Sequence, residues 1–428
     1  MTALSQRLAV GEPIASPTWR LIAPLAALHG AMFVYDLAHP ERFLNADRAR
    51  ERIGLLKGFP EALHSGDAMA YIAGHGIVGD WLPQALLFLA GGQPLVIAAQ
   101  VMLALASVLW VREIGLRIGL RDSQADAAAV VYALLPHTLV FPHQLVSEAL
   151  FVPLVVLSFR LALTAGGALA LGVSTLVRPI TALWPFAAAA LQPASAGKRA
   201  RYVAAALAPL LAWMGFVWMA TGEFSMGRSP HDLGGNLYER MQRMGATLPQ
   251  AERPPEKPAG QTKASLAEYL RFALAHPATA AAHSARDGAA ITFKSGIERV
   301  TLDYLDLFPA SRALQKADGG WRESLEQRGV LATFAELVRT QPWLIGSSAL
   351  AALAFTAFMA LALYGAVTTR RSREWLLLTL FVLYVAATAQ LVDRAQSRHR
   401  APAEFALCLL AAAGWAALRA RRQKTDGR

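Results

Sequence analysis

The residues of this chain best suited to chemistry are carboxylates and arginines at the ends of long apolar stretches. Asp67 lies in the polar segment after the first apolar run, where a carboxylate can serve as a general base or a metal ligand. Glu148 begins another apolar run, where it can accept a proton or orient a substrate hydroxyl. Arg178 is the only charged residue between positions 166 and 191, and a charge at membrane depth requires protein, water or an anionic partner. These residues indicate proton transfer and anion binding.

Each of these residues also has a purely structural interpretation. Asp67 can be a solvated aspartate or the cap of a short helix. Glu148 can stabilise the N-terminus of its helix through the helix dipole, and Arg178 can pair with Glu148 or with backbone carbonyls. His137 and His143 flank one short turn, so they can bind a divalent metal ion together or pack at the membrane interface. The first polar segment holds further acids, namely Asp47, Glu51, Glu61 and Asp80.

A second group of arginines, Arg394, Arg398 and Arg400, precedes the last apolar run. The guanidinium group is a planar, bidentate fork that suits phosphate well. Interfacial arginines also bind the phosphates of ordinary membrane lipids, which is the alternative interpretation. If these arginines reach the same membrane face as Arg178, together they suit a phosphate group at that face.

The composition places these residues in a membrane protein. The chain is 55% hydrophobic and 17% charged, whereas soluble domains carry about 25% charged residues. We expect an all-α polytopic membrane protein with about eight full transmembrane helices, the first of them a retained anchor rather than a cleaved signal peptide. The predicted spans are 17–36, 93–111, 124–140, 145–164, 202–221, 343–366, 375–392 and 402–418.

The segment 166–191 is additional to these spans. Its two parts, on either side of Arg178 and Pro179, are each too short to cross a hydrocarbon core of about 30 Å at about 1.5 Å per residue. The segment is therefore either one kinked helix or a broken half-helix pair that forms a V. With the N-terminus inside, the V places ten basic residues of the later clusters inside and three outside, and a full crossing does the reverse. The positive-inside rule favours the V.

This topology predicts three parts of the chain, with the chemistry on the extracytoplasmic face of the cytoplasmic membrane. They are a transmembrane module at 1–221 with an outer catalytic loop at 37–80, an extracytoplasmic region at 222–342, and C-terminal transmembrane helices at 343–428. The region 222–342 is too long for a simple connection, so we expect it to be mostly helical. The apolar spacing predicts helices at 265–275 and 324–339, and the residues 252–261 are typical of a linker.

Several classes of protein are excluded by what the sequence lacks. Cys408 is the only cysteine and falls in an apolar run, which excludes disulfides and thiolate metal sites. The net charge of +11 arises from basic clusters at the ends of the spans, and no nucleic-acid or nucleotide motif accompanies it. We therefore expect no nucleic-acid partner and no cofactor, with a divalent metal ion as the only candidate.

Five short motifs follow one another along the chain. They are Gly66-Asp67-x-x-x-Tyr71; Gly79-Asp80-Trp81-Leu82-Pro83 with Ala90-Gly91-Gly92; Ser147-Glu148; Thr175-Leu176-Val177-Arg178-Pro179; and Arg398-His399-Arg400-Ala401-Pro402. In this order the motifs resemble those of the GT-C superfamily of membrane glycosyltransferases. The resemblance is closest to the branch of dolichyl-phosphate-mannose–protein mannosyltransferase-like and aminoarabinose transferase-like enzymes. It covers most of 17–220 and 375–418 but not the region 222–342.

The resemblance implies an inverting transfer of a sugar from a polyprenyl-phosphate donor to a glycan, lipid or protein acceptor. On this resemblance the catalytic residues are Asp67 and Glu148, with Asp67 as the base. The substrate-binding residues are Tyr71, Asp80, His143, Arg178, Arg398 and Arg400, of which the last three would bind the lipid phosphate. Asp67 stands alone, about thirty residues into its loop, whereas the family commonly carries paired acids close to the first span. Asp47 and Asp80 are therefore rival bases.

Two other classes of function also fit the sequence. A transporter or flippase for an anionic lipid or solute commonly has broken helices and intramembrane charges. Such proteins usually show internal repeats, and this chain shows none. A non-catalytic accessory subunit of envelope polysaccharide assembly is the third interpretation. Release of free lipid phosphate from a polyprenyl-phosphate sugar discriminates the enzyme from the transporter.

Overall fold

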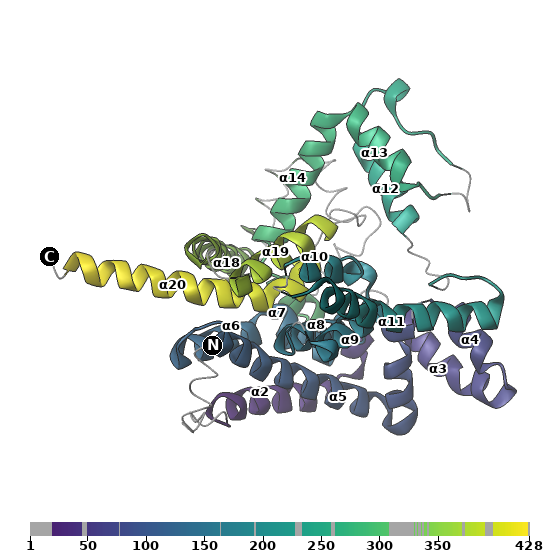
Figure 1. Ribbon diagram of the computed structural model, residues 1–428, viewed down its shortest axis with the longest axis horizontal. Helices are drawn as coiled ribbons and strands as arrows, with labels where there is room; N and C mark the ends of the chain where they lie inside the picture. The colour runs from purple at the N-terminus through teal and green to yellow at the C-terminus, as the bar shows by residue number, and fades with distance from the viewer. Residues whose placement is uncertain are drawn as a thin grey trace.

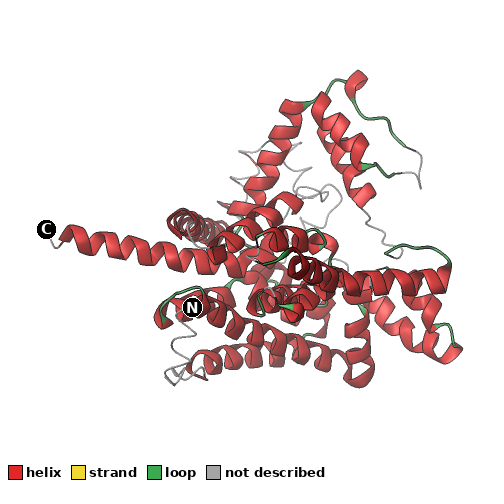
Figure 2. Ribbon diagram, in the orientation of Figure 1, coloured by secondary structure: helices red, strands yellow, loops and turns green. Residues whose placement is uncertain are grey.

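The described part of the protein is mostly helical. The computed structural model describes residues 19–44, 49–76, 78–162, 164–191, 194–226, 233–257, 262–307, 342–369, 373–389 and 397–426, and single positions between 329 and 339. Within these residues no strand occurs, as Figure 2 shows. The fold class expected from the sequence, an all-α protein, is confirmed.

Among the described residues, five stretches of helix are long and apolar enough to cross a membrane. They belong to α2 (Trp19–Ala38), α5 (Leu82–Arg117), α11 (Ala196–Thr221), α18 (Pro342–Thr369) and α20 (Glu404–Asp426). A sixth span is possible if α6 (Asp122–Leu134) and the following stretch Pro136–His143, bent by 63°, cross as one. The chain is therefore a membrane protein by the length and composition of its helices.

The count of eight full spans is not confirmed. The span expected at 145–164 is α8 (Glu148–Arg160), which has 13 residues, and the one expected at 375–392 is α19 (Arg373–Thr388), which has 16. A perpendicular crossing needs about 20 residues. Helix α8 is short because the residues directly before it are not helical. The span expected at 124–140 is divided by the bend at Leu135.

The break predicted at Arg178 is present. Helix α9 (Ala165–Val177) ends there, Arg178 has extended backbone angles (φ −145°, ψ 121°), and Pro179 begins the short helix η4 (Pro179–Thr181). Proline cannot donate a helical hydrogen bond and disfavours helical geometry in the residue before it. Helix α10 (Trp184–Ala190) follows, so the segment consists of two half-length apolar helices.

The hydroxyl groups at this break form a small buried network. The Thr181 hydroxyl lies 3.0 Å from that of Thr175 and 3.2 Å from that of Ser174. Tyr384 of α19 donates to the carbonyl of Ile180. These hydrogen bonds satisfy polar groups that the interrupted helix would otherwise leave buried without partners.

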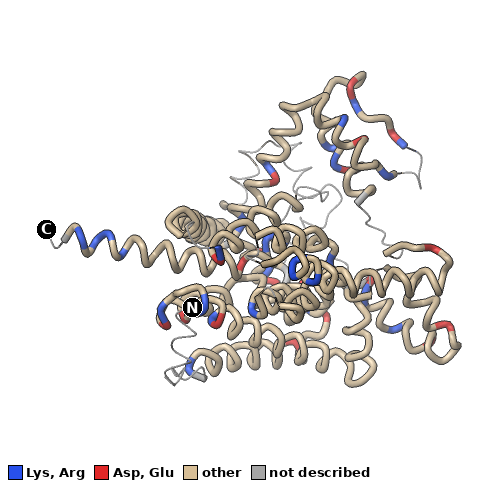
Figure 3. Tube along the Cα trace, in the orientation of Figure 1, with Lys and Arg blue, Asp and Glu red and all other residues tan. Residues whose placement is uncertain are grey.

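Long helices surround the break and form the main apolar core. Helix α9 packs against α8 and α11, and α20 packs against α6 and α18. Helices α18 and α20 cross closely at Gly365 and Gly414, where each glycine faces the backbone of the other helix. Figure 1 shows that α20 extends beyond the other helices toward the C-terminus, and Figure 3 shows Lys and Arg gathered along that end.

The first loop and the connections of the bundle consist of short helices. The first loop contains η1 (Pro40–Leu44), α3 (Ala49–Ser65), α4 (Ala68–Gly74) and η2 (Val78–Asp80). Between α6 and α8 lie α7 (Pro136–Val140) and η3 (Phe141–His143). The segment η8 (Ser397–Ala403) leads into α20.

The region 222–342 carries a small helical unit of its own. Its elements are α12 (Leu233–Gly245), η5 (Gln250–Glu252), α13 (Leu266–Ala275), α14 (Pro277–Phe293) and η6 (Arg299–Tyr304). Helices α12, α13 and α14 pack on one another and project from the bundle in Figure 1.

The predicted helix at 265–275 is confirmed, and Ser265 caps it reciprocally with Glu268. A charged pair, Arg240 and Asp287 at 2.5 Å, is buried among α12, α13 and α14. The predicted helix at 324–339 lies outside the described residues, apart from single positions. The residues 253–257 of the predicted linker form no helix.

Candidate functional site

The structure brings two motifs that are distant in sequence into contact at the break. A Cβ atom on Gly79 would lie 2.6 Å from the carbonyl oxygen of Leu176 and 2.8 Å from the amide nitrogen of Val177. Only glycine permits so close an approach of two backbones. Ala73 and Val78 also share an apolar cluster with Leu176 and α11. The first loop therefore packs directly against the end of α9, one residue before Arg178.

Arg178 and Glu148 form an ion pair beside this contact. The Nη1 atom of Arg178 lies 3.0 Å from Oε1 of Glu148, and Ser147 donates a hydrogen bond of 3.1 Å to Oε2. The Glu148 side chain is 3% exposed, whereas the Arg178 side chain is 27% exposed. The pairing that the sequence offered as a structural interpretation of Arg178 is confirmed. Because Arg178 is partly exposed, the guanidinium group remains accessible to a second anionic partner.

Further positive charges gather around this pair. Arg398 of η8 and Arg52 of α3 act electrostatically on the Glu148 carboxylate, as Arg178 does. The His399 imidazole is subject to the charges of Arg398, Arg178 and Glu148, and also to that of Arg299 in η6. We call Arg52, Arg178 and Arg398 the arginine cluster. Three guanidinium charges thus act on the Glu148 carboxylate, and Arg299 acts with Arg178 and Arg398 on the His399 imidazole.

The position of Glu148 is fixed by the buried segment before it. Gln84 of α5 donates a hydrogen bond of 3.1 Å to the carbonyl of Val146, and Arg52 donates one of 3.4 Å to that of Leu145. The Leu145 amide donates to the carbonyl of Phe43 in η1. A non-helical backbone inside a membrane protein needs such partners, and here they hold Glu148 against Arg178.

A small cavity adjoins the buried side of Glu148. Its volume of about 20 Å³ suits about one water molecule. The polar residues in its wall are Ser107, Tyr132, His137, Thr138 and Glu148.

His143 belongs to a second buried network rather than to this site. Its Nδ1 lies 2.5 Å from Oδ2 of Asp36, and its Nε2 lies 2.9 Å from Nδ1 of His29. Tyr304 of η6 donates a hydrogen bond of 2.7 Å to Oδ1 of Asp36. The His143 side chain is completely buried, and these contacts give it a structural role; its expected role in substrate binding stays a prediction.

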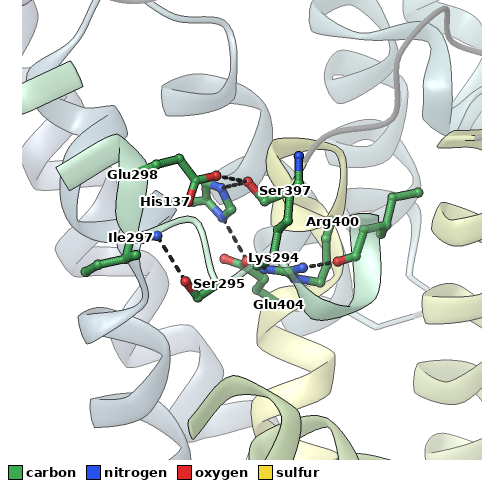
Figure 4. Close-up of polar contacts among 9 residues, drawn as sticks. His137, Lys294, Ser295, Ile297, Glu298, Ser397, Arg400 and Glu404 are labelled. Atoms are coloured by element: carbon green, nitrogen blue, oxygen red, sulfur yellow. Dashed lines mark hydrogen bonds and ion pairs between the residues drawn. The ribbon is translucent and has the colours of Figure 1, made fainter. Parts of the chain in front are cut away.

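Arg400 belongs to a third buried network, shown in Figure 4. Its guanidinium group donates to Glu404 and to the carbonyls of Ile291 and Lys294, and it lies over the ring of Phe355. These contacts join η8 to the end of α14. They give Arg400 a structural role, and its expected role in substrate binding stays a prediction.

His137 joins the Arg400 network to a serine. Its Nδ1 lies 2.8 Å from Oε1 of Glu404, and its Nε2 lies 3.3 Å from Oγ of Ser397. Ser397 in turn donates to Glu298 at 3.2 Å, as the dashed lines in Figure 4 show. His137 and His143 therefore bind different carboxylates. Within the described residues, no group of three or more His, Cys, Asp or Glu side chains is arranged to hold a metal ion.

The predicted residues of the first loop lie in different environments. Asp67 is exposed, precedes α4 without capping it through its side chain, and makes no side-chain hydrogen bond or ion pair with the described residues. Tyr71 donates a hydrogen bond of 3.0 Å to the carbonyl of Leu55 and packs against Trp81, so it stabilises the loop. The side chain of Asp80 and the whole of Arg394 lie outside the described part of the chain.

The sequence did not single out several residues of these networks, among them Asp36, Arg52, Arg299 and Glu404. Asp36 carried a usable signal, because it is an acid at the very end of the first predicted span. Glu404 had the same signal at the start of the last span. Arg52 and Arg299 lie in polar segments with many charges, where nothing local distinguishes them.

Comparison with protein-family models, with curated proteins and with solved structures finds no match to this chain.

Proposed function

We propose that this protein is a membrane-embedded glycosyltransferase that uses a polyprenyl-phosphate-linked sugar as donor. The arginine cluster at the break after α9 is the observation that carries this proposal. In it the partly exposed Arg178 is held by the buried Glu148, with Arg52 and Arg398 close by. Guanidinium groups fixed in advance stabilise a phosphate most strongly where water is scarce. The order of the five motifs along the chain supports the same enzyme class.

The proposed reaction replaces one bond at the sugar by another. The acceptor hydroxyl oxygen forms a bond to the anomeric carbon from the face opposite the phosphate, and the bond from that carbon to the phosphate oxygen breaks. Both electrons of that bond leave with the lipid phosphate, whose charge changes from about −1 to about −2. The arginine cluster stabilises this added negative charge. The acceptor proton passes to a carboxylate base.

Asp67 is the candidate base, and Glu148 is a positioning residue. A base must reach the acceptor proton directly or through one water molecule. Asp67 is exposed and its loop packs against the break, whereas Glu148 is buried and its carboxylate faces Arg178. Glu148 orients Arg178 toward the phosphate. We propose that the site opens to the extracytoplasmic side and that the prenyl chain lies against the apolar faces of the neighbouring helices.

Release of lipid phosphate tests this function. The full chain, purified in a mild detergent, is incubated with a set of radiolabelled polyprenyl-phosphate sugars and a crude extract of envelope acceptors. We expect transfer of label and release of free polyprenyl phosphate, with a loss of about 100-fold in Arg178→Gln. Arg271→Gln, which removes an exposed charge from α13, is the matched control and should retain the wild-type rate.

Two results would overturn the proposal. If no donor in the set is consumed and the protein reconstituted in vesicles moves the intact donor between leaflets, the protein is a flippase. If Asp67→Ala and Arg178→Gln both transfer sugar at the wild-type rate, the proposed site is wrong.

A further inference from the structure

The segment 296–306 of the region 222–342 lies beside the arginine cluster, and its backbone is unusual at both ends and in the middle. It begins at Gly296 with φ +84° and ends at Asp306, a non-glycine residue with φ +53°. Between them lies the π-helix η6 (Arg299–Tyr304). Both π-helices and left-handed non-glycine residues are rare and cluster at functional sites, because the surrounding structure must hold them in place.

Four contacts hold this segment against other parts of the chain. Glu298 accepts a hydrogen bond of 3.2 Å from Ser397, and Tyr304 donates one of 2.7 Å to Asp36. Asp306 forms an ion pair of 3.2 Å with Arg42. The fourth contact is the backbone of Gly296, where a Cβ atom would lie 2.9 Å from the His137 ring. The partners belong to the beginning of the chain, its middle and its end.

The hydrogen bond from Tyr304 to Asp36 is buried. The Tyr304 side chain is 1% exposed, and burial together with the adjacent Asp36 carboxylate raises the pKa of its phenol. The phenol therefore remains a hydrogen-bond donor throughout the physiological pH range. Asp36 also binds His143, so η6 is joined to the same buried segment that positions Glu148.

Arg299 is the residue that this arrangement brings to the site. It opens η6, directly after Glu298, and is partly exposed. Its charge acts on His399 together with those of Arg178 and Arg398. The side-chain contacts of Glu298 and Tyr304, on either side of Arg299, fix the backbone that carries it, as expected of a residue that must meet a ligand with defined geometry.

We propose that Arg299 is a further phosphate-binding residue of this site, held in place by the segment 296–306 of the region 222–342. This proposal rests on the proposed function, because it assigns a ligand to the same arginine cluster. Arg178 and Arg398 come from the ends of membrane helices, whereas Arg299 comes from the region that no motif explained. The region 222–342 then takes part in donor binding directly.

Binding of a lipid phosphate to the full-length protein in detergent tests this proposal without requiring transfer activity. The probes are a polyprenyl monophosphate and the matching uncharged polyprenol, and the measured quantity is the ratio of their affinities. A variant that merely lowers the amount of folded protein reduces both affinities equally and leaves this ratio unchanged. A variant that removes a phosphate ligand lowers the ratio.

Arg299→Gln should lower the ratio about 10-fold or more, because a hydrogen bond to a charged group contributes about 1.5–3 kcal/mol. Arg299→Lys should recover part of it, since lysine keeps the charge but lacks the bidentate fork. Tyr304→Phe keeps Arg299 but removes the hydrogen bond to Asp36, and should lower the ratio by a smaller factor. Arg286→Gln is the matched control, because Arg286 is an exposed arginine of the preceding helix α14.

The outcomes separate this proposal from the proposed function. If Arg178→Gln lowers the ratio and Arg299→Gln behaves like Arg286→Gln, the role of Arg299 is refuted while the phosphate site stands. If Tyr304→Phe leaves the ratio at its wild-type value, the segment does not position Arg299. If the wild-type protein binds the phosphate no more tightly than the polyprenol, the phosphate site itself is refuted.

Discussion

Replacing Arg178 by glutamine should destabilise the protein because it leaves the charge of Glu148 buried without its closest partner. Glu148 is 3% exposed and lies 3.0 Å from Arg178. Removal of one partner from a buried ion pair costs about 3–5 kcal/mol. Because Arg398 and Arg52 still act on the carboxylate, we expect a value near the lower end, about 3 kcal/mol.

Replacing the other partner of the ion pair, Glu148, should destabilise the protein less. In Glu148→Gln the remaining charge is that of Arg178, which is 27% exposed and can be hydrated. We therefore expect a loss of about 1 kcal/mol, in the range of a single hydrogen bond. The double variant contains neither charge and should be destabilised by only about 1 kcal/mol, which is less than the sum of the single effects.

The assay is the unfolding of the purified protein in detergent, followed by circular dichroism as denaturant is added. Wild type, both single variants and the double variant form a complete thermodynamic cycle. If the effects of the two single substitutions simply add in the double variant, the ion pair contributes nothing and the reasoning fails. In the transfer assay the double variant should remain inactive although its stability is largely restored, because the phosphate has lost Arg178.

Three other substitutions test how the site is held. Gly79→Ala should reduce transfer at least 10-fold with little loss of helix content, because its Cβ atom would displace the first loop from Leu176; Gly54→Ala, with open space around it, should leave the rate unchanged. Gly414→Ala places a Cβ atom against the carbonyl of Leu361 and should cost about 1–3 kcal/mol in denaturant unfolding. Gly215→Ala, in open space on α11, should be neutral or slightly stabilising. If Gly414→Ala and Gly215→Ala change the stability equally, the crossing of α18 and α20 is not tight. His143→Ala removes the buried partner of Asp36 Oδ2 and of the His29 ring, and should cost about 1–3 kcal/mol by the same measurement. The exposed His64→Ala should have no measurable effect.

Short sequence patterns were sufficient to predict the structural features that depend only on residues close together in the sequence. The break after α9 follows from Pro179 in an apolar stretch, and the start of α13 follows from the Ser265 and Glu268 pair. The Arg178–Glu148 pair could be anticipated because a charge in an apolar segment needs a partner, and few candidates existed. These parts of the fold and site could be read from the sequence.

The number of transmembrane spans could not be predicted from such local patterns. Apolar runs at 124–140 and 145–164 have the composition of transmembrane helices, but the structure uses them for a bent pair and a 13-residue helix. The reason is the buried segment between them, whose backbone is satisfied by side chains from α3 and α5. Hydropathy does not record such tertiary hydrogen bonds.

The polar networks depend on pairings across large distances in sequence. His143 and Asp36 are 107 residues apart, and His137 and Glu404 are 267 apart. Each of these residues had several possible partners, and only helix packing selects among them. Arg400 shows the consequence, since its place in a phosphate-binding motif suggested a ligand but its contacts are to Glu404 and two carbonyls.

The most direct test of the account is an electron-cryomicroscopy structure of the protein with a bound polyprenyl phosphate. We predict density for the phosphate at the exposed side of Arg178, within about 2.7–3.2 Å of the guanidinium groups of Arg178 and Arg398, with the prenyl chain along the apolar helices. Density for the phosphate at any other place, with the Arg178–Glu148 pair unliganded, would contradict the central claim.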